Sequence, residues 1–318
     1  MSVRYTKPFL RVEDQLVLLD LRGMSIDDEV VAARALDTIG YYNLSGYWYP
    51  MRRMANQPHP RERLDDFEDG VSFSDVMALY QFDKMLRLLV LEKIEQVEQA
   101  VKVAVAQVLG IESATAHTKR GFFRHDFVTC PPGRDKSRHD RWLAKHSETL
   151  NDRRSQWNFI EHYLTNYSPP PPIWIAIETW DFGETSRLVS GLNRPYSDNI
   201  AERFGVRKSS VFESWLAAIG SVRNICAHHE RLWNRDITRQ PNQHSDSFFS
   251  GAAKTDKTWH RFYGIALILA YLDSTIVGDT TWGARLANHV EQLPVAPGVH
   301  LGAMGMPSTW SEHTAWRA

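Results

Sequence analysis

The chain has 318 residues, 43% of them hydrophobic and 24% charged, and its 37 Lys and Arg nearly balance its 38 Asp and Glu for a net charge of −1. This is an ordinary globular composition, long enough for one large or two modest domains. It excludes a bulk polycation, so nucleic-acid binding must come from a local patch, and no apolar run approaches the roughly 18 residues of a membrane span.

The first residues and the number of cysteines indicate the cellular compartment in which the protein is expected. Met1 to Lys7 lack the apolar segment of a signal peptide. The two cysteines, Cys130 and Cys226, are too few for a disulfide framework or a cysteine zinc cluster. We therefore expect a protein of the reducing cytoplasm that does not bind a membrane.

Two short helices are predicted in the first 40 residues. One begins near Val12, has its apolar positions on one face, and ends before Gly23, which suits a C-cap. The other spans roughly 28–39 and ends at Gly40. Its expected inward positions are Val31, Ala35 and Leu36.

An aromatic cluster follows between Tyr41 and Pro50. One interpretation is a turn that inserts its rings into the core. The other is a stacking surface for unpaired RNA bases, in which Tyr47 and Trp48 would contact the RNA.

A loop and then a long helix are predicted next. Residues 52–70 are charged and contain prolines, which is typical of a loop. From a cap at Ser72 or Ser74, apolar residues recur at helical spacing to Gly110, and at 1.5 Å per residue such a helix is roughly 55 Å long. Its polar positions predict a solvated face, or a carboxylate that pairs with Arg223 or helps to place a substrate; they include Asp83, Lys84, Arg87, Glu92, Glu95, Glu98 and Gln99.

The segment 117–150 holds four histidines without the spacing of a metal site. His117, His125, His139 and His146 follow no zinc template. We expect a loop and a helix here, no metal and no other cofactor.

The rest of the chain also predicts helices, which makes the fold class all-α. Residues 168–172 are a stiff proline connector, and residues 235–258 are a polar loop. Helical patterns cover 173–188, 199–204, 211–233, 259–275 and 280–292. We assign an N-terminal helical extension to 1–70, a helical bundle to 71–292, and a Gly- and Pro-containing tail that packs on the bundle to 293–318.

The helix predicted over 211–233 has a clear core face. Ser210 and Glu213 form a candidate capping box at its start. At 100° per residue, its core face includes Trp215, Ala218, Ile219, Val222, Ile225, Cys226, His229 and Trp233. We expect Cys226 to be a small buried group rather than a nucleophile, and His229 to be a packed, hydrogen-bonded histidine.

Arg223, Asn224 and His228 lie on the other side of this helix and face either solvent or a cleft. Such a trio suits cleavage of RNA, which carries its own nucleophile in the 2′-OH. Imidazole can act as general base or general acid, guanidinium can clamp the charge that develops on the phosphate, and Asn can orient the imidazole or bind a phosphate oxygen. One trio supplies a single acid or base, and two copies across a two-fold axis would supply both.

The sequence resembles the Abi (abortive infection) family of bacterial phage-defence proteins, of the AbiD/AbiF type, along nearly its whole length. Arg223-Asn224-x-x-x-His228 resembles the R-x4-6-H motif of HEPN-domain ribonucleases. The segments that carry the resemblance are Lys7 to Leu10 with Glu13 to Leu16, Ile39 to Pro50, Tyr80 to Arg87, Pro172 to Trp174 with Phe182-Gly183, Arg223 to Asn234, and Met304 to Pro307 with Trp310.

The resemblance implies a HEPN-like α-helical bundle and a metal-independent endoribonuclease. It implies a homodimer with the motifs at the interface and, in some members, a bound small RNA. Arg223 and His228 carry over as catalytic residues and Asn224 as a supporting one, and Arg231 and Arg87 are further candidate RNA contacts. DNA is not an expected partner. The alternatives are an RNA-binding defence protein without catalysis, a toxin component restrained by a partner RNA or antitoxin, and a helix that serves dimerisation alone.

Overall fold

The computed structural model describes residue 6 and residues 8–55, 63–250, 256–276, 278 and 281–317, without the side chains of 256 and 257. Lys7 of the first quoted motif lies outside the described residues, as do parts of the predicted loops 52–70 and 235–258, residue 280 of the last predicted helix and residue 318 of the tail. The fold is all-α, as predicted, apart from one small hairpin. The elements are α1 Val12–Leu21, α2 Glu29–Thr38, α3 Tyr41–Trp48, β1 Arg52–Met54, β2 Arg63–Phe67, α4 Phe73–Glu112, α5 His125–Val128, α6 Arg138–Asp152, α7 Asn158–Asn166, α8 Ile173–Ala176, α9 Phe182–Gly191, α10 Arg194–Glu202, α11 Ser209–Ala227, α12 Asp256–His260, α13 Phe262–Ile276 and α14 Thr281–Val290.

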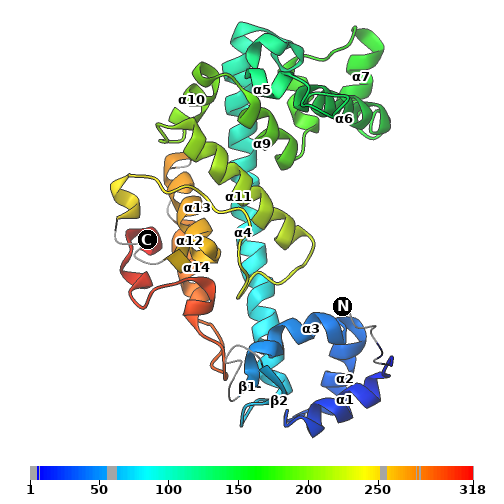
Figure 1. Ribbon diagram of the computed structural model, residues 1–318, viewed down its shortest axis with the longest axis vertical. Coiled ribbons are helices and arrows are strands. Elements are labelled where there is room, and N and C mark those ends of the chain that lie inside the picture. The colour runs from blue at the N-terminus through cyan, green and yellow to red at the C-terminus, as the bar shows by residue number, and fades with distance from the viewer. Residues whose placement is uncertain are drawn as a thin grey trace.

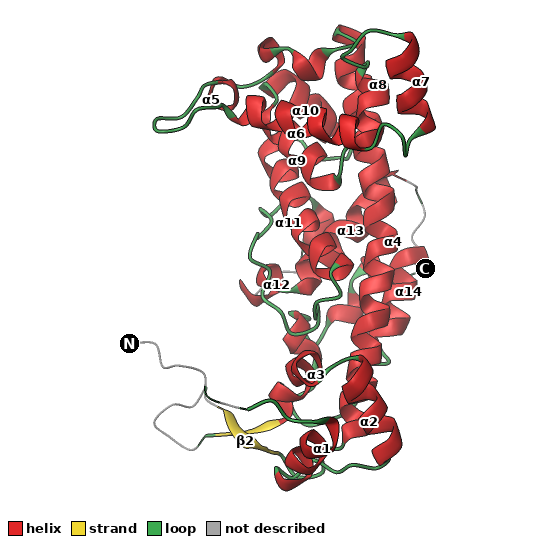
Figure 2. Ribbon diagram, turned by 90° about the vertical axis from the view of Figure 1, so that its right-hand side faces the viewer, coloured by secondary structure: helices red, strands yellow, loops and turns green. Residues whose placement is uncertain are grey.

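Helix α4 runs the length of the elongated molecule, and the other elements are arranged along it (Figure 1). The predicted cap is present, because the Ser72 hydroxyl accepts the N–H of Asp75 while the Asp75 carboxylate accepts the N–H of Ser72. Helices α3, α8, α9, α10, α11, α13 and α14 all pack against α4. Figure 2 shows α11 and α13 alongside its middle and α1–α3 at one end. Within the described ranges, no helix combines the length and the apolar character that crossing a membrane requires.

The N-terminal region differs from its prediction in three places. The aromatic cluster forms helix α3 rather than a turn. The predicted loop 52–70 contains an antiparallel hairpin, in which Arg52 pairs with Phe67. Short exposed strands rich in charge give no alternating apolar pattern, which is why the sequence did not indicate them. Val31, predicted to face inward, is exposed on α2, whereas Ala35 and Leu36 are buried as expected.

Helix α11 is shorter at its C-terminus than predicted. It ends at Ala227, and a Schellman motif closes it: the His229 N–H donates to the Cys226 carbonyl at 3.1 Å and the Glu230 N–H to the Ile225 carbonyl at 3.0 Å. His229 takes the left-handed conformation, with φ 58°, at the position that glycine usually occupies. The chain therefore turns away, and His229 is exposed rather than packed in the core. Trp233 is buried as predicted, but it lies beyond the helix.

The start of α11 also lacks its predicted capping box. The helix begins at Ser209, whose backbone N–H donates to the Asp198 carboxylate at 3.1 Å. Glu213 instead pairs with Arg124 at 3.1 Å. The cap therefore comes from α10, which packs against α11, rather than from the helix's own first turn.

The C-terminal segment covers α13 and α14. Met304, Trp310 and Trp316 are buried in the core. Gly283 of α14 lies against the tail so closely that a Cβ there would come 2.0 Å from the Ala315 carbonyl oxygen. The predicted boundaries between the N-terminal extension, the bundle and the tail, at residues 70 and 292, stay a prediction.

Candidate functional site

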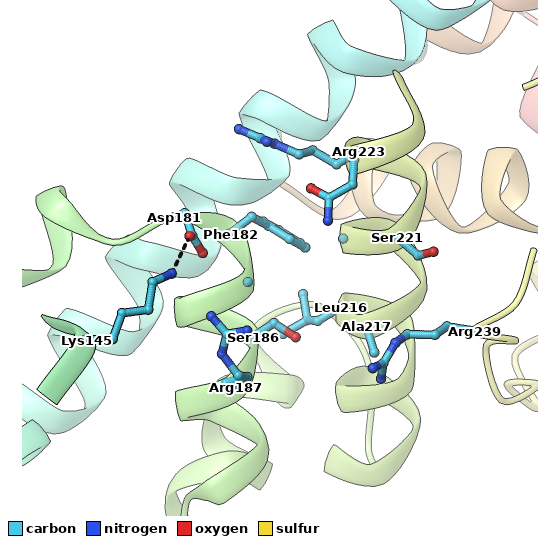
Figure 3. A pocket seen from close by; sticks show the side chains of 13 residues that line it. Lys145, Asp181, Phe182, Ser186, Arg187, Leu216, Ala217, Ser221, Arg223 and Arg239 are labelled. Atoms are coloured by element: carbon cyan, nitrogen blue, oxygen red, sulfur yellow. Dashed lines mark hydrogen bonds and ion pairs between the residues drawn. The ribbon is translucent and has the colours of Figure 1, made fainter. Parts of the chain in front are cut away.

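A cleft of about 420 Å³ opens between α9 and α11, on the side from which α6 approaches. Figure 3 shows Lys145 of α6, Arg187 of α9 and Arg223 of α11 on three neighbouring helices, with Arg239 reaching in from the loop after α11. The lining is completed by Asp181, Phe182, Gly183, Ser186, Leu216, Ala217, Gly220, Ser221 and Asn224. Two residues of the predicted trio, Arg223 and Asn224, therefore share one cleft wall.

A close approach of α9 and α11 forms the floor of this cleft. Phe182, at the start of α9, is buried against Gly220 of α11. A Cβ at Gly220 would lie 3.2 Å from the Phe182 ring, so a larger residue would push the two helices apart. Asp181 fixes the start of α9 through a capping box with Glu184.

The charge of the cleft is positive and largely unpaired. Lys145 is neutralised, because its ammonium lies 3.1 Å from Asp181 and 3.3 Å from Glu184. Burial acts to raise the pKa of Asp181, but the Glu184 N–H and the Lys145 ammonium outweigh it and lower that pKa. Among the described residues, no ion pair or side-chain hydrogen bond holds the guanidinium groups of Arg187, Arg223 and Arg239, although the charge of Arg187 also helps to lower the pKa of Asp181. Three arginines that line one hollow without an ion pair are suited to an anion with several oxygens.

His228 lies just beyond the cleft. It is the C-cap residue of α11, and its backbone N–H donates to the Asn224 carbonyl at 2.9 Å. The imidazole is exposed and is not part of the cleft lining. Arg223, Asn224 and His228 are thus all outside the core, as the helical positions predicted, while Val222, Ile225 and Cys226 are buried.

The chain after His228 is anchored by Asp83 of α4. The Asp83 carboxylate accepts the N–H groups of Leu232 and Trp233, at 3.2 and 2.6 Å. It also accepts the Tyr47 hydroxyl at 2.8 Å and pairs with Arg87. One buried carboxylate therefore joins α3, α4 and the segment that follows α11.

The predicted RNA contacts at Tyr47, Trp48 and Arg87 are wrong, because these side chains lie at or near the buried Asp83 network. Tyr47 and Trp48 are fully buried and Arg87 is buried beside Asp83, so none of the three presents a surface to RNA. The core interpretation of the aromatic cluster therefore holds for Tyr47 and Trp48, whereas Tyr42 and Tyr49 are exposed. Arg231 is partly buried, and its guanidinium donates to the Gly46 carbonyl, so it braces α3 rather than facing outward.

The predicted solvated face of α4 is present at Lys84, Glu95 and Gln99, which are exposed, but not at all of its polar positions. Asp83 and Arg87 are buried rather than solvated. Glu92 pairs with Arg285 at 2.6 Å and Glu98 with Lys102 at 3.2 Å. None of these carboxylates pairs with Arg223 in the part of the chain that the structure describes.

Cys226 and three of the four histidines of the segment 117–150 are buried, whereas His125 is exposed. Burial raises the pKa of Cys226 to about 12, which keeps it a thiol, as expected of a small buried group. His117 and His146 lie in an aromatic cluster with Trp142 and Trp180. His139 packs on Phe123 and Phe127, and its Nε2 lies 2.9 Å from the His117 carbonyl. No group of side chains able to hold a metal ion occurs among the described residues.

Lys145, Arg187 and Arg239 were not singled out in the sequence. Arg187 follows the Phe182-Gly183 segment, but nothing local marks it as different from any helical arginine. Arg239 lies in a polar loop, where arginine is unremarkable. Only the packing of α6, α9 and α11 places the three side chains in one cleft.

A family model described as Abi-like protein matches residues 34–234. This range includes α3, α4, α9 and α11 and ends just after the Asp83-bound Trp233. No curated protein and no solved structure matches the chain significantly.

Proposed function

Because the chain belongs to the Abi-like protein family, we propose that it is the endoribonuclease effector of an abortive-infection phage-defence system, acting in the cytoplasm. The family model covers most of the chain and includes the whole of α11 with its motif. The family supports a part in abortive infection, and the geometry around α11 supports the chemistry.

The unpaired guanidinium of Arg223 carries the proposal. Arg223 lines the cleft that Arg187, Arg239 and Asn224 also line, and its guanidinium has no ion pair among the described residues. An arginine held without a partner in a concave site is free to bind a phosphate. We assign Arg223 the role of clamping the charge that develops on the phosphorus centre.

In the proposed reaction the 2′-OH of RNA attacks the adjacent phosphorus, and the bond to the 5′-oxygen breaks. The products are a 2′,3′-cyclic phosphate and a free 5′-OH. His228 takes the 2′-OH proton or donates one to the leaving oxygen, and Asn224 donates to a phosphate oxygen. The protein supplies these groups from side chains alone, so we expect cleavage in the presence of EDTA.

A second copy of the chain completes the proposed site. One exposed imidazole can act as either acid or base in a given step, and His228 lies at the accessible end of α11. In a homodimer with two α11 ends facing each other, one His228 would act as base and its partner as acid. Light scattering should then give twice the mass of the chain.

The test is cleavage of a labelled RNA in EDTA by four proteins: wild type, Arg223→Ala, His228→Ala and His229→Gly. The last is a matched control, because His229 is the neighbouring exposed histidine. We expect cyclic phosphate ends from wild type and His229→Gly, and a loss of at least about 100-fold in the other two, the lower end of the contribution of one acid–base group or one charge-stabilising donor. Cleavage that survives His228→Ala in a folded protein would contradict the assignment.

One observation favours a second function, an RNA clamp without catalysis. The cleft brings Arg223 and Asn224 together with other cations, but its lining contains no histidine. Sequencing the RNA that co-purifies with wild type and with His228→Ala distinguishes the two. A defined small RNA retained equally by both, with no cleavage by either, favours the clamp.

A further inference from the structure

A second hollow lies next to the cleft and shares part of its lining. Its volume is about 490 Å³, and it extends over α6 and α9. Its lining consists of Phe127, Arg138, Arg141, Trp142, Lys145, Arg187 and Ser190. Lys145 and Arg187 line both hollows, so the two adjoin at these side chains.

Cationic side chains follow this path from one helix to the next. We name the basic track after its six cations, which are Arg138, Arg141 and Lys145 of α6, Arg187 of α9, Arg223 of α11, and Arg239. Positions 138, 141 and 145 lie on one face of α6 and span about 10 Å along it. The sole carboxylate among the lining residues of the two hollows is Asp181, which Lys145 already engages.

Most of these cations are available to a ligand. Arg141 is exposed, and its one side-chain contact among the described residues is a hydrogen bond to the Lys136 carbonyl at 3.3 Å. Arg138 has an exposed partner, Asp126, at 3.8 Å, a separation at which a surface pair contributes little. A chain with a net charge of −1 thus concentrates positive charge along one path.

The aromatic rings along the track are not available for stacking. Phe127 and Trp142 are each 5% exposed and Phe182 is 2% exposed. Proteins that bind single strands through their bases present open rings to them. A track with cations and no exposed ring is suited to binding the sugar-phosphate backbone of a single strand. The bases of that strand would then point away from the protein.

We propose that the basic track binds the sugar-phosphate backbone of a single-stranded RNA, which runs from the motif on α11 across α9 to α6. The proposal rests on the proposed function and deepens it, because it names how the substrate lies beyond the reacting phosphate. Arg187, at the junction of the two hollows, contacts the phosphate next to the one held by Arg223. Recognition is independent of base identity.

The experiment measures binding of a fluorescent 2′-O-methyl RNA of about 12 nucleotides, a length within the usual site range. This oligonucleotide lacks the nucleophile, so binding is measured without cleavage. Affinity is measured against salt for wild type, Arg141→Ala, Arg187→Ala and the charge reversal Arg141→Glu. Arg34→Ala is the matched control, because Arg34 is an exposed arginine on α2, at the other end of the molecule.

We expect each alanine variant to reduce the slope of log affinity against log salt by about 0.7, the value for one phosphate contact on a single strand. Arg141→Glu should weaken binding at least about tenfold, and Arg34→Ala should change neither quantity. Oligo(U) and oligo(A) should bind within about threefold of each other, since nothing reads the bases. Unchanged slopes in the track variants, or a base preference above about tenfold, would overturn the proposal.

The same variants separate this proposal from the proposed function. If wild type cleaves RNA and the track variants bind it as wild type does, the track is wrong and the ribonuclease stands. If the variants lose binding but His228→Ala and wild type are equally inactive on RNA, the track stands and the ribonuclease is wrong.

Discussion

The Asp83 carboxylate accepts the backbone N–H of Trp233 at 2.6 Å, across 150 positions of sequence. Through this bond the N-terminal third of α4 holds the segment that follows the motif helix. His228 lies a few residues before that segment, at the C-cap of α11. The position of the proposed catalytic histidine therefore depends on a buried ionic network that does not touch the cleft.

Replacing Asp83 with Asn should lower the free energy of unfolding by about 3–5 kcal/mol, because Arg87 would lose its partner in the core. The amide can still accept one backbone N–H, so the fold should persist at low temperature. Urea denaturation measures the change. Glu92→Gln is the control, since its pair with Arg285 is exposed and should contribute under about 1 kcal/mol. Equal effects of the two substitutions would show that Asp83 is not a buried anchor.

Tyr47→Phe tests whether the aromatic cluster is structural. The hydroxyl donates to Asp83 at 2.8 Å and accepts from Arg87 at 3.1 Å, so its loss should cost about 1.5–3 kcal/mol of unfolding free energy, the range for bonds to charged groups. RNA affinity at 20 °C should be unchanged, because the ring is buried. Tyr42→Phe, on an exposed ring of the same helix, should change stability by less than about 0.5 kcal/mol. A loss of RNA affinity without a loss of stability would restore the stacking interpretation.

The sequence predicted elements that depend on local signals. The cap at Ser72 and the apolar spacing up to Gly110 lie within α4 or at its ends, and the helix forms where they indicate. Cys226 was correctly placed in the core because its position on α11 follows from helical geometry alone.

Features that depend on distant partners could not be predicted. Asp83 and Arg87 are four positions apart, and such a pair on a helix usually faces solvent. Its burial is decided by Tyr47 and by the N–H groups of Leu232 and Trp233. In the same way, Arg187 and Arg239 become cleft residues only when α9 and the loop after α11 meet.

The end of α11 was missed for a different reason, which gives a further prediction. A glycine normally marks a Schellman motif, and here a histidine occupies that position. His229→Gly should therefore raise the free energy of unfolding by about 1 kcal/mol, because glycine adopts φ 58° without the strain of a Cβ. Thermal unfolding followed by circular dichroism measures it.

His228→Gly is the matched comparison. His228 has an ordinary φ of −90°, so glycine there relieves no strain and should lower stability by about 0.5–1 kcal/mol. Two substitutions of adjacent histidines thus have opposite expected signs. A loss of stability in both would mean that α11 does not end at this motif in solution.

The last prediction concerns pH. Burial, reinforced by the neighbouring His146 and His139, lowers the pKa of His117 to about 3, and burial lowers that of His146 to about 4. Neither ring nitrogen of His117 has a hydrogen-bond partner within the described part of the chain. In the unfolded chain both histidines take up a proton near pH 6.5, whereas the folded protein keeps them neutral.

The unfolded state therefore binds more protons between pH 6.5 and about 4, and folding stability must fall as the pH drops through that window. Each histidine contributes a slope of about 1.4 kcal/mol per pH unit. The free energy of unfolding should be measured with urea at pH 7, 6 and 5. Its slope against pH should be smaller by that amount in His117→Leu than in wild type. His162→Gln, an exposed histidine of α7, should leave the slope unchanged. If His117→Leu keeps the wild-type slope, then His117 is charged or solvated in the folded protein, contrary to its position among Trp142, His146 and Trp180.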